Sequence, residues 1–288
     1  MQPAARTAIL TAVAMVAFAA NSLLCRLALG HHLIDPATFT GVRVVSGASV
    51  LTAITLLRGN ARAALAVDWR AAAMLVTYMV FFSCAYLSLS AGTGALVLFG
   101  AVQLTMFTVA LRGGERFSPL SWAGLALAAA GLLYLVLPGV TAPNLLSAVL
   151  MAIAGSAWGF YSLLGRTARD AATATAGAFI YAVPAVLIVA LVAGVTSGLQ
   201  ATSSGLALAI ASGAIASGCG YVIWYAALPG LGAARAATVQ LSVPIIAALG
   251  GVLILSEDMT LRLLFAAAAT LGGVTIVLTQ RAQAPRRS

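Results

Sequence analysis

The sequence is dominated by about ten apolar segments, each near 20 residues long, and nearly all charged residues lie in the gaps between them. A bilayer core about 30 Å thick is crossed by roughly 20 helical residues that rise 1.5 Å each. Lipid offers no hydrogen-bond partners, so a spanning backbone must pair within itself. The pattern therefore predicts an all-α integral membrane protein and excludes most folds of soluble enzymes.

Composition identifies the role of the charges. Only 7% of residues are charged, against roughly 25% in soluble domains, and 62% are hydrophobic. The 15 basic residues are all arginine and outnumber six acidic ones, which gives a net charge of +9. Because they stand singly or in pairs at segment ends, they are interpreted as topology signals rather than as a nucleic-acid surface. We expect membrane lipid and a small-molecule substrate as partners, and no nucleic acid.

Ten spans are predicted, over residues 7–29, 37–57, 69–90, 93–111, 119–137, 144–165, 172–193, 204–228, 233–255 and 261–279. The first is too long for the apolar region of a signal peptide. A cytoplasmic N-terminus places twelve arginines inside and leaves only Arg26, Arg43 and Arg262 towards the outside. The inner set is Arg6, Arg58, Arg62, Arg70, Arg112, Arg116, Arg166, Arg169, Arg235, Arg281, Arg286 and Arg287. An even number of spans then puts both termini in the cytoplasm.

The chain also repeats. Glu115 precedes Ser118 and the fifth span, and Glu257 precedes Thr260 and the tenth, so each copy has the form Glu-x-x-Ser/Thr before an apolar helix. Two five-helix halves, residues 1–140 and 141–288, fit these anchors. Because five is odd, the second half enters the membrane from the opposite side, which is the inverted-repeat architecture of many secondary transporters around a central cavity.

These features resemble a known family. Ten helices as five plus five, the two Glu-x-x-Ser/Thr copies, and Tyr225-Ala-Ala-Leu running into Gln240-Leu-Ser-Val-Pro244 are similar to the drug/metabolite transporter superfamily. Within it the chain resembles EamA-type exporters, and among these the YddG-type exporters of aromatic amino acids. Two positions in this sequence differ from the pattern that is usual in this superfamily. Ser256 stands where glycine is usual, and the fourth span has no proline that matches Pro244.

Polar and aromatic side chains inside the spans are the candidates for a substrate site. Asparagine and glutamine in hydrocarbon need partners and should face the bundle interior. Aromatic rings beside them suit an apolar organic solute with one polar head. For each aromatic residue, ordinary core packing is the alternative. The predicted substrate-binding residues are Asn21, Tyr78, Phe82, Gln103, Trp158, Tyr161, Trp224 and Gln240.

The positions of the charged residues restrict which transport mechanisms are possible. All six acidic residues lie at span ends or in loops, so the intramembrane carboxylate of a proton relay is missing. We expect facilitated diffusion or exchange, with no cofactor and no metal. For Glu115 and Glu257 we expect helix capping and pairing with nearby arginines. Arg26 and Arg43 either snorkel to the outer interface or contact a substrate carboxylate at the cavity rim.

The resemblance implies export of aromatic or other neutral amino acids and related metabolites. From the positions of the polar and aromatic residues, we expect alternating access through a central cavity lined by spans one, three, four, six, eight and nine. A broad multidrug or metabolite exporter is the alternative of the same fold. An intramembrane lipid-handling enzyme is the alternative of another class, supported only by His31 and His32. The arginine-only, alanine-rich composition favours a bacterial inner membrane. Glycines on spans five and ten either mediate a weak homodimer or pack within a monomer.

Overall fold

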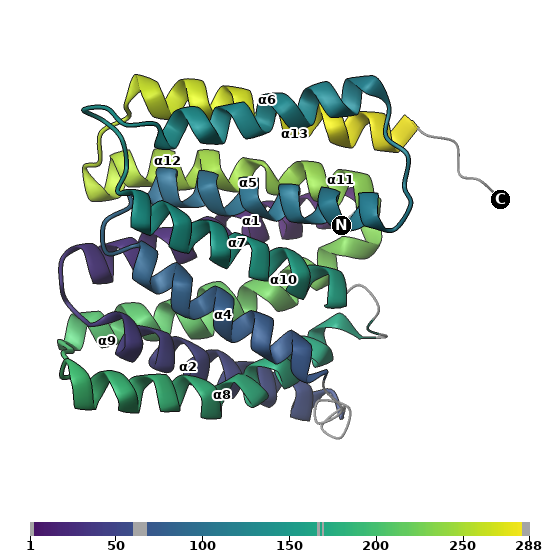
Figure 1. Ribbon diagram of the computed structural model, residues 1–288. Helices are drawn as coiled ribbons and strands as arrows, with labels where there is room; N and C mark the ends of the chain where they lie inside the picture. The colour runs from purple at the N-terminus through teal and green to yellow at the C-terminus, as the bar shows by residue number, and fades with distance from the viewer. Residues whose placement is uncertain (1–2, 60–67, 166–167, 169, 284–288) are drawn as a thin grey trace.

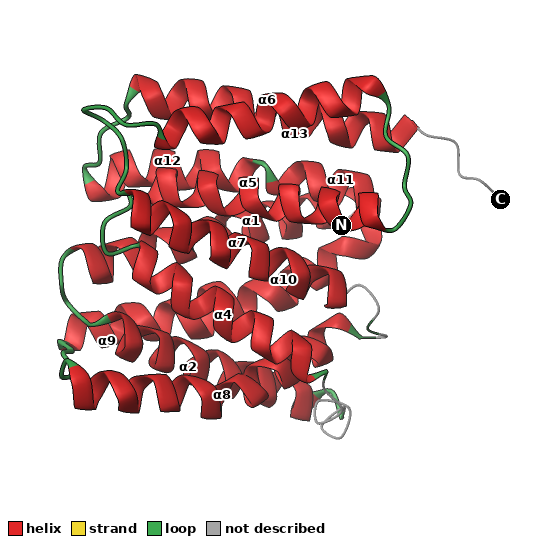
Figure 2. Ribbon diagram, viewed as in Figure 1, coloured by secondary structure: helices red, strands yellow, loops and turns green. Residues whose placement is uncertain are grey.

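The computed structural model describes residues 3–59, 68–165, 168 and 170–283, and this part of the chain forms helices and connecting turns (Figure 2). Within it the one extended pairing is an isolated β-bridge between Ile34 and Ala201. Nine helices of the described residues are long and apolar enough to cross a membrane, and the shorter apolar helix Trp69–Ala85 makes the tenth. The fold is therefore the all-α multi-pass membrane architecture that the sequence predicts.

The helices follow the predicted spans closely. They are α1 (Pro3–Gly30), α2 (Pro36–Leu57), α4 (Trp69–Ala85), α5 (Ala91–Arg112), α6 (Pro119–Val136), α7 (Leu145–Gly165), α8 (Ala171–Thr196), α9 (Ser203–Ile210), η1 (Ala211–Cys219), α10 (Gly220–Ala227), η2 (Leu228–Gly230), α11 (Gly232–Gln240), α12 (Ser242–Leu255) and α13 (Leu261–Gln283).

Three spans differ from their predicted form. The third ends at Ala85 rather than at residue 90, because Tyr86 caps α4 and Ser90 already caps α5. The eighth is α9, η1 and α10 in sequence, with nine π-helical residues in the middle. The ninth is interrupted at Leu241, two residues before Val243 and three before Pro244, and so consists of α11 and α12. Proline has no N–H to donate, so it favours a break of this kind.

The helices lie side by side, with both chain ends at the same end of the bundle (Figure 1). The arginines predicted to lie inside collect at that end where the structure describes them, at the termini of α1, α2, α4, α5, α11 and α13 and in the turn before α6. Five of the twelve fall outside the described residues: Arg62, Arg166, Arg169, Arg286 and Arg287. We call the opposite end, which carries the turns after α1, α4, α6, α8 and α12, the outer end.

At the outer end the turn before α2 is tied to the turn before α9. Asp35 caps α2 by accepting from the backbone of Ala37 and Thr38, and it also accepts from Gln200 N–H at 3.0 Å. Burial alone would raise the pKa of Asp35, but these hydrogen bonds outweigh it and lower that pKa below its ordinary value. Asp35 is thus the N-cap of α2, with a proline at the first helical position, and it joins two turns that lie far apart in the sequence.

Helices α6 and α13 pack on each other along one flank of the bundle (Figure 1). A methyl group added to Gly124 would lie 2.7 Å from the Gly273 carbonyl oxygen, and one added to Gly131 would lie 2.9 Å from the Ala266 carbonyl oxygen. Gly131 and Gly273 each follow their capping Ser118 or Thr260 by 13 residues, and Gly124 and Ala266 follow by six. The contact is therefore symmetric, and these glycines serve packing within one chain.

Two glycine substitutions in α13, one at its contact with α6 and one away from it, test this packing. Gly273→Ala forces its methyl group against the backbone of Gly124 and Ala128, whereas a methyl group at Gly272 meets nothing within 4 Å. We expect Gly273→Ala to destabilise the protein by about 1–3 kcal/mol, the usual cost of overpacking. Gly272→Ala should be neutral or slightly stabilising, because alanine favours a helix over glycine. Thermal unfolding in detergent measures both, and equal melting temperatures for the two variants would contradict the described crossing.

Candidate functional site: a central aromatic cavity and an outer cavity

A small cavity lies in the centre of the bundle. Its volume is about 20 Å³, which is room for roughly one water molecule. The lining comes from α1, α4, α5, α7, α10 and α11, which belong to spans one, three, four, six, eight and nine, the six assigned from the sequence. The lining residues are Phe18, Asn21, Ser22, Tyr78, Phe82, Leu98, Phe99, Trp158, Tyr221 and Gln240.

Aromatic rings enclose this cavity, with Trp158 at their centre. The indole stacks on Tyr221 with ring centroids 5.4 Å apart and planes inclined by 22°. It also contacts Tyr78 at 4.9 Å, and Phe18 continues the group at 5.7 Å from Tyr221. Gly155, one turn before Trp158, lies against the Leu98 carbonyl oxygen of α5, so the absence of a side chain lets α7 approach closely.

The structure brings five of the eight predicted site residues to the cavity: Asn21, Tyr78, Phe82, Trp158 and Gln240. Two more form a second layer. The Tyr161 ring contacts Trp158 at 5.3 Å, and its hydroxyl donates to Thr175 Oγ1 at 3.1 Å. Trp224 packs edge-on against Phe18 at 5.9 Å.

Gln103 does not line the central cavity. Leu98 and Phe99 occupy the lining position on α5, and Gln103 lies four residues beyond Phe99, about 6 Å further along the helix towards the inner end. Of the two glutamines predicted to bind substrate, Gln240 therefore lines the central cavity and Gln103 does not.

Five lining residues were not predicted from the sequence: Phe18, Ser22, Leu98, Phe99 and Tyr221. Two of them, Phe18 and Ser22, could have been predicted from sequence features. Phe18 is the one aromatic residue of α1, and Ser22 is next to Asn21, which had been assigned to the bundle interior. Leu98 and Phe99 could not be distinguished from their neighbours, because every residue from 94 to 102 is apolar and only packing selects the face that meets the cavity.

A polar network lies behind one wall of the cavity. Ser212 and Ser217 both donate to Asn21 Oδ1, at 2.8 and 3.2 Å. These serines are five residues apart and belong to the π-helix η1, whose hydrogen bonds run between residues five apart and so bring them to one side. An α-helix would turn them away from each other. The π-helical turn is therefore what lets two hydroxyls reach a single amide oxygen.

Arg43 extends this network from α2. Its side chain is fully buried, so the expectation that it snorkels to the interface is wrong. Arg43 Nη2 donates to Tyr78 Oη and to Ser217 Oγ, each at 3.2 Å. The guanidinium also lies over the rings of Tyr78 and Phe82, 5.5 and 5.0 Å from their centroids. Tyr78, Phe82 and Asn21 thus connect Arg43 to the central cavity.

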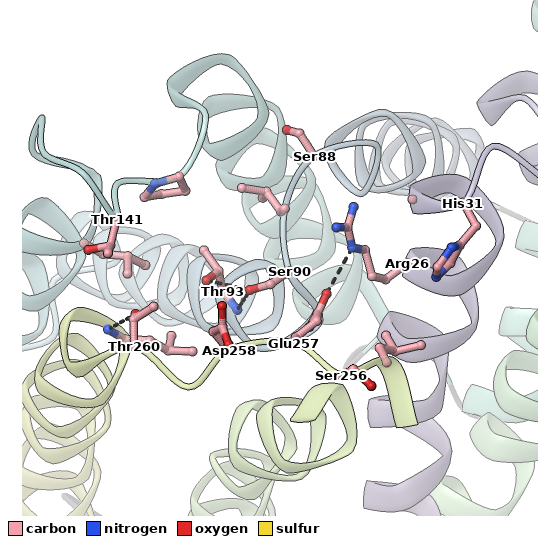
Figure 3. Close-up of a pocket in the computed structure, with 16 residues that line it drawn as sticks. Arg26, His31, Ser88, Ser90, Thr93, Thr141, Ser256, Glu257, Asp258 and Thr260 are labelled. Atoms are coloured by element: carbon pink, nitrogen blue, oxygen red, sulfur yellow. Dashed lines mark hydrogen bonds and ion pairs between the residues drawn. The ribbon is translucent and has the colours of Figure 1, made fainter. Parts of the chain in front are cut away.

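A second, larger cavity of about 450 Å³ lies at the outer end (Figure 3). Arg26 and Glu257 face each other in it, with Arg26 Nε 3.0 Å from Glu257 Oε1. Arg26 Nη1 also donates to the backbone oxygens of Tyr86 and Leu87 at 3.3 and 3.2 Å. Ser22 of the central cavity lies one helical turn from Arg26 on α1, so the two cavities are stacked along this helix.

Glu257 also acts as a helix cap. Its Oε2 accepts from Ala91 N–H at 2.8 Å, at the first turn of α5. Capping and pairing with arginine were both expected, but the partners are remote in sequence: Arg26 is 231 residues away and Ala91 is 166. One carboxylate therefore ties the turn before α13 to α1 and to α5. Among the described residues, no acidic side chain lines the central cavity.

Neither cavity carries a metal-binding cluster. Among the described residues no group of three or more histidine, cysteine, aspartate or glutamate side chains is placed to hold a metal ion. His31 lines the outer cavity, whereas His32 is exposed in the turn after α1.

Comparison with known proteins identifies the class. Residues 145–279 match the EamA-like transporter family. The chain is 48% identical to an uncharacterized protein of Pseudomonas aeruginosa over 281 residues, which cover 97% of this chain and 96% of that protein. A crystal structure of another protein superposes with a TM-score of 0.64 and 19% identity, covers 96% of this chain and 99% of its own, and shows the shared fold. The chain belongs to the EamA-like transporter family and is a multi-pass membrane transporter.

The Arg26–Glu257 contact should control access from the outer cavity to the central one. In a chain whose three cysteines are replaced, Ser22→Cys places a thiol in the central cavity. Glu257→Gln removes the ion pair, and we expect a charged maleimide to label that thiol up to about fivefold faster, since a partly exposed ion pair contributes ~0.2–1 kcal/mol.

Asp258→Asn is the matched control for this labelling experiment. Asp258 is adjacent, exposed and lines the same outer cavity. Its substitution should leave the labelling rate unchanged. Equal acceleration by both variants would mean that the carboxylate charge of the outer cavity, rather than the ion pair, controls access.

Proposed function

We propose that this transporter exports aromatic or other neutral amino acids and related metabolites by alternating access, as facilitated diffusion or exchange. The observation that carries the proposal is the aromatic enclosure at the bundle centre, with Trp158 between Tyr78 and Tyr221. Planar apolar groups gain contact area and favourable ring packing in such a site. Asn21 and Gln240 add amide groups that can orient one polar head.

The size of the cavity supports a conformational cycle. A drug-sized ligand needs roughly 300–1,000 Å³, whereas the central cavity holds about 20 Å³ in this conformation. The surrounding helices must therefore separate before a substrate enters. The outer cavity of about 450 Å³ already has the necessary volume and lies one helical turn away. We assign it to the exit path.

The moving parts in this proposal are two inverted five-helix halves, residues 1–140 and 141–288. The symmetric glycine contact between α6 and α13, the fifth and tenth spans, supports this division. Their peripheral position also supports it, since neither helix contributes to the central cavity. Rocking of one half against the other opens the centre alternately to each side. The same contact uses the glycines within one chain, which favours a monomer over a weak homodimer.

The positions of the acidic residues support an uncoupled mechanism. Asp35, Asp68 and Asp170 are N-caps of α2, α4 and α8, and Glu115, Glu257 and Asp258 lie in turns. A proton-coupled carrier usually places a carboxylate on the substrate path inside the membrane. The arginine-rich end supports cytoplasmic termini in a bacterial inner membrane, by the positive-inside rule.

The alternative is a broad multidrug or metabolite exporter of the same fold. It draws on the same aromatic cavity, because rings accept many apolar solutes. The two proposals differ in selectivity: an amino-acid exporter needs a site for the charged head, whereas a multidrug exporter needs only apolar contact. A lipid-handling enzyme would depend on His31 and His32, and replacing both with alanine should leave the transporter active.

The first test is counterflow of phenylalanine. Vesicles containing purified protein are loaded with unlabelled phenylalanine, and labelled phenylalanine is added outside. We expect saturable uptake that is insensitive to a pH gradient. Trp158→Ala should lower it about tenfold, since it removes the half-buried ring that packs on Tyr78 and Tyr221, and each aromatic pair contributes ~0.5–1.5 kcal/mol.

Trp69→Ala is the matched control, because Trp69 is the first residue of α4 and 71% exposed. It should retain counterflow, which separates the loss of a cavity ring from the loss of any tryptophan. Counterflow driven by a pH gradient would contradict the uncoupled mechanism. Absence of counterflow in a folded preparation would contradict the amino-acid substrate and favour the drug or metabolite alternative.

A further inference from the structure

We infer that Arg43 selects substrates by their carboxylate, through a wall of hydrogen-bond donors that it imposes on the central cavity. The inference rests on the proposed function in one respect, namely that the central cavity is the substrate site. The inference specifies the charge of the polar head of the substrate, which the aromatic rings of the cavity do not determine. It also assigns a role to the one fully buried arginine among the residues whose burial the structure describes.

The first step is the unbalanced charge of Arg43. Its side chain is fully buried, and within the described part of the chain the single ion pair is Arg26–Glu257. Arg43 Nη1 has no hydrogen-bond partner among those residues. A buried cation without a counter-ion is costly, and inside a membrane protein such a group usually marks a substrate or ion pathway. The missing counter-ion is best supplied by an anionic ligand.

The second step follows the direction of the hydrogen bonds. Arginine only donates, so Tyr78 Oη and Ser217 Oγ both accept from Arg43. Ser217 then donates its proton to Asn21 Oδ1, which also accepts from Ser212. With its oxygen occupied twice, Asn21 offers its NH₂ group, and Tyr78 offers its hydroxyl proton. Both residues line the cavity, so the groups that they present there are donors.

The third step is the electrostatic field at the cavity. Arg43 lies over the rings of Tyr78 and Phe82, 5.5 and 5.0 Å from their centroids, and both of these side chains line the cavity. Burial removes most solvent screening, so the positive charge acts over this distance more strongly than it would in water. A donor wall and a positive field together favour a carboxylate. They disfavour an isolated ammonium, since no acidic side chain in the described part of the chain lines the cavity.

Three ligands that share a phenylethyl core test this selection. Phenylalanine carries both charges, 3-phenylpropanoate only the carboxylate, and phenethylamine only the ammonium. Equilibrium binding of each is measured by calorimetry on purified protein, with Trp158→Ala as the control that places binding in the central cavity. We expect phenylalanine and 3-phenylpropanoate to bind about tenfold to a hundredfold more tightly than phenethylamine, the range expected for charge-assisted hydrogen bonds.

The Arg43→Gln variant identifies the source of the preference. It should bring 3-phenylpropanoate and phenethylamine to within about threefold of each other, whereas Arg43→Lys should keep part of the preference because it keeps the charge. Ser217→Ala should weaken carboxylate binding while leaving that charge in place. The measured quantity is the ratio of the dissociation constants of two ligands for the same protein preparation, so partial loss of folded protein does not affect it.

The outcomes separate this inference from the proposed function. Carboxylate preference that is lost in Arg43→Gln supports the inference even if phenylalanine shows no counterflow, a result that would overturn only the proposed amino-acid export. Equal binding of phenethylamine and 3-phenylpropanoate by the unaltered protein, or a ratio unchanged in Arg43→Gln, overturns the inference and leaves export intact. No binding of any of the three ligands to folded protein overturns both.

Discussion

Hydrocarbon provides no hydrogen bonds, and the structure is organised around this one constraint. Each polar side chain within the spans must find its partner inside the bundle. Arg43, Ser217, Asn21 and Ser212 are joined by hydrogen bonds across α2, η1 and α1, and Arg43 Nη1 is left without a partner among the described residues. The network therefore fixes how three helices meet, and it places its amide and phenol ends at the central cavity. In the proposed function, the residues that hold these helices together are also the ones that recognise the substrate.

Small residues set how closely the helices approach. Gly213 of η1 lies against the backbone oxygen of Arg43, so the π-helix contacts α2 directly. Gly155 brings α7 against α5, and this contact positions Trp158 towards the centre. Lipid tails are as apolar as leucine, so close van der Waals packing rather than hydrophobic burial favours such contacts. The small-residue composition of residues 211–219, Ala-Ser-Gly-Ala-Ile-Ala-Ser-Gly-Cys, is what makes the close π-helical contact sterically possible.

The outer end concentrates interactions that join distant parts of the chain. Glu257 connects the turn before α13 to α1 and α5, and Asp35 connects the turn before α2 to the turn before α9. Such contacts are few, polar and partly exposed, whereas the helix contacts beneath them are extensive and apolar. A transporter needs this contrast, because bonds at one end must break and re-form while the helices remain intact. The position of Arg26 between the two cavities gives the ion pair a direct place in that cycle.

The sequence by itself determined the membrane fold, the number and limits of most spans, the end of the bundle where the arginines collect, and the six spans around the centre. Length, hydropathy and caps such as Asp35-Pro36 are local properties, so they could be predicted without a structure. Tertiary structure alone decided that Leu98 and Phe99, rather than Gln103, meet the cavity, because every residue from 94 to 102 is apolar. It alone decided that Arg43 is buried and that Glu257 pairs with Arg26. These outcomes depend on which helices touch, and the spacing of residues along one chain does not contain that information.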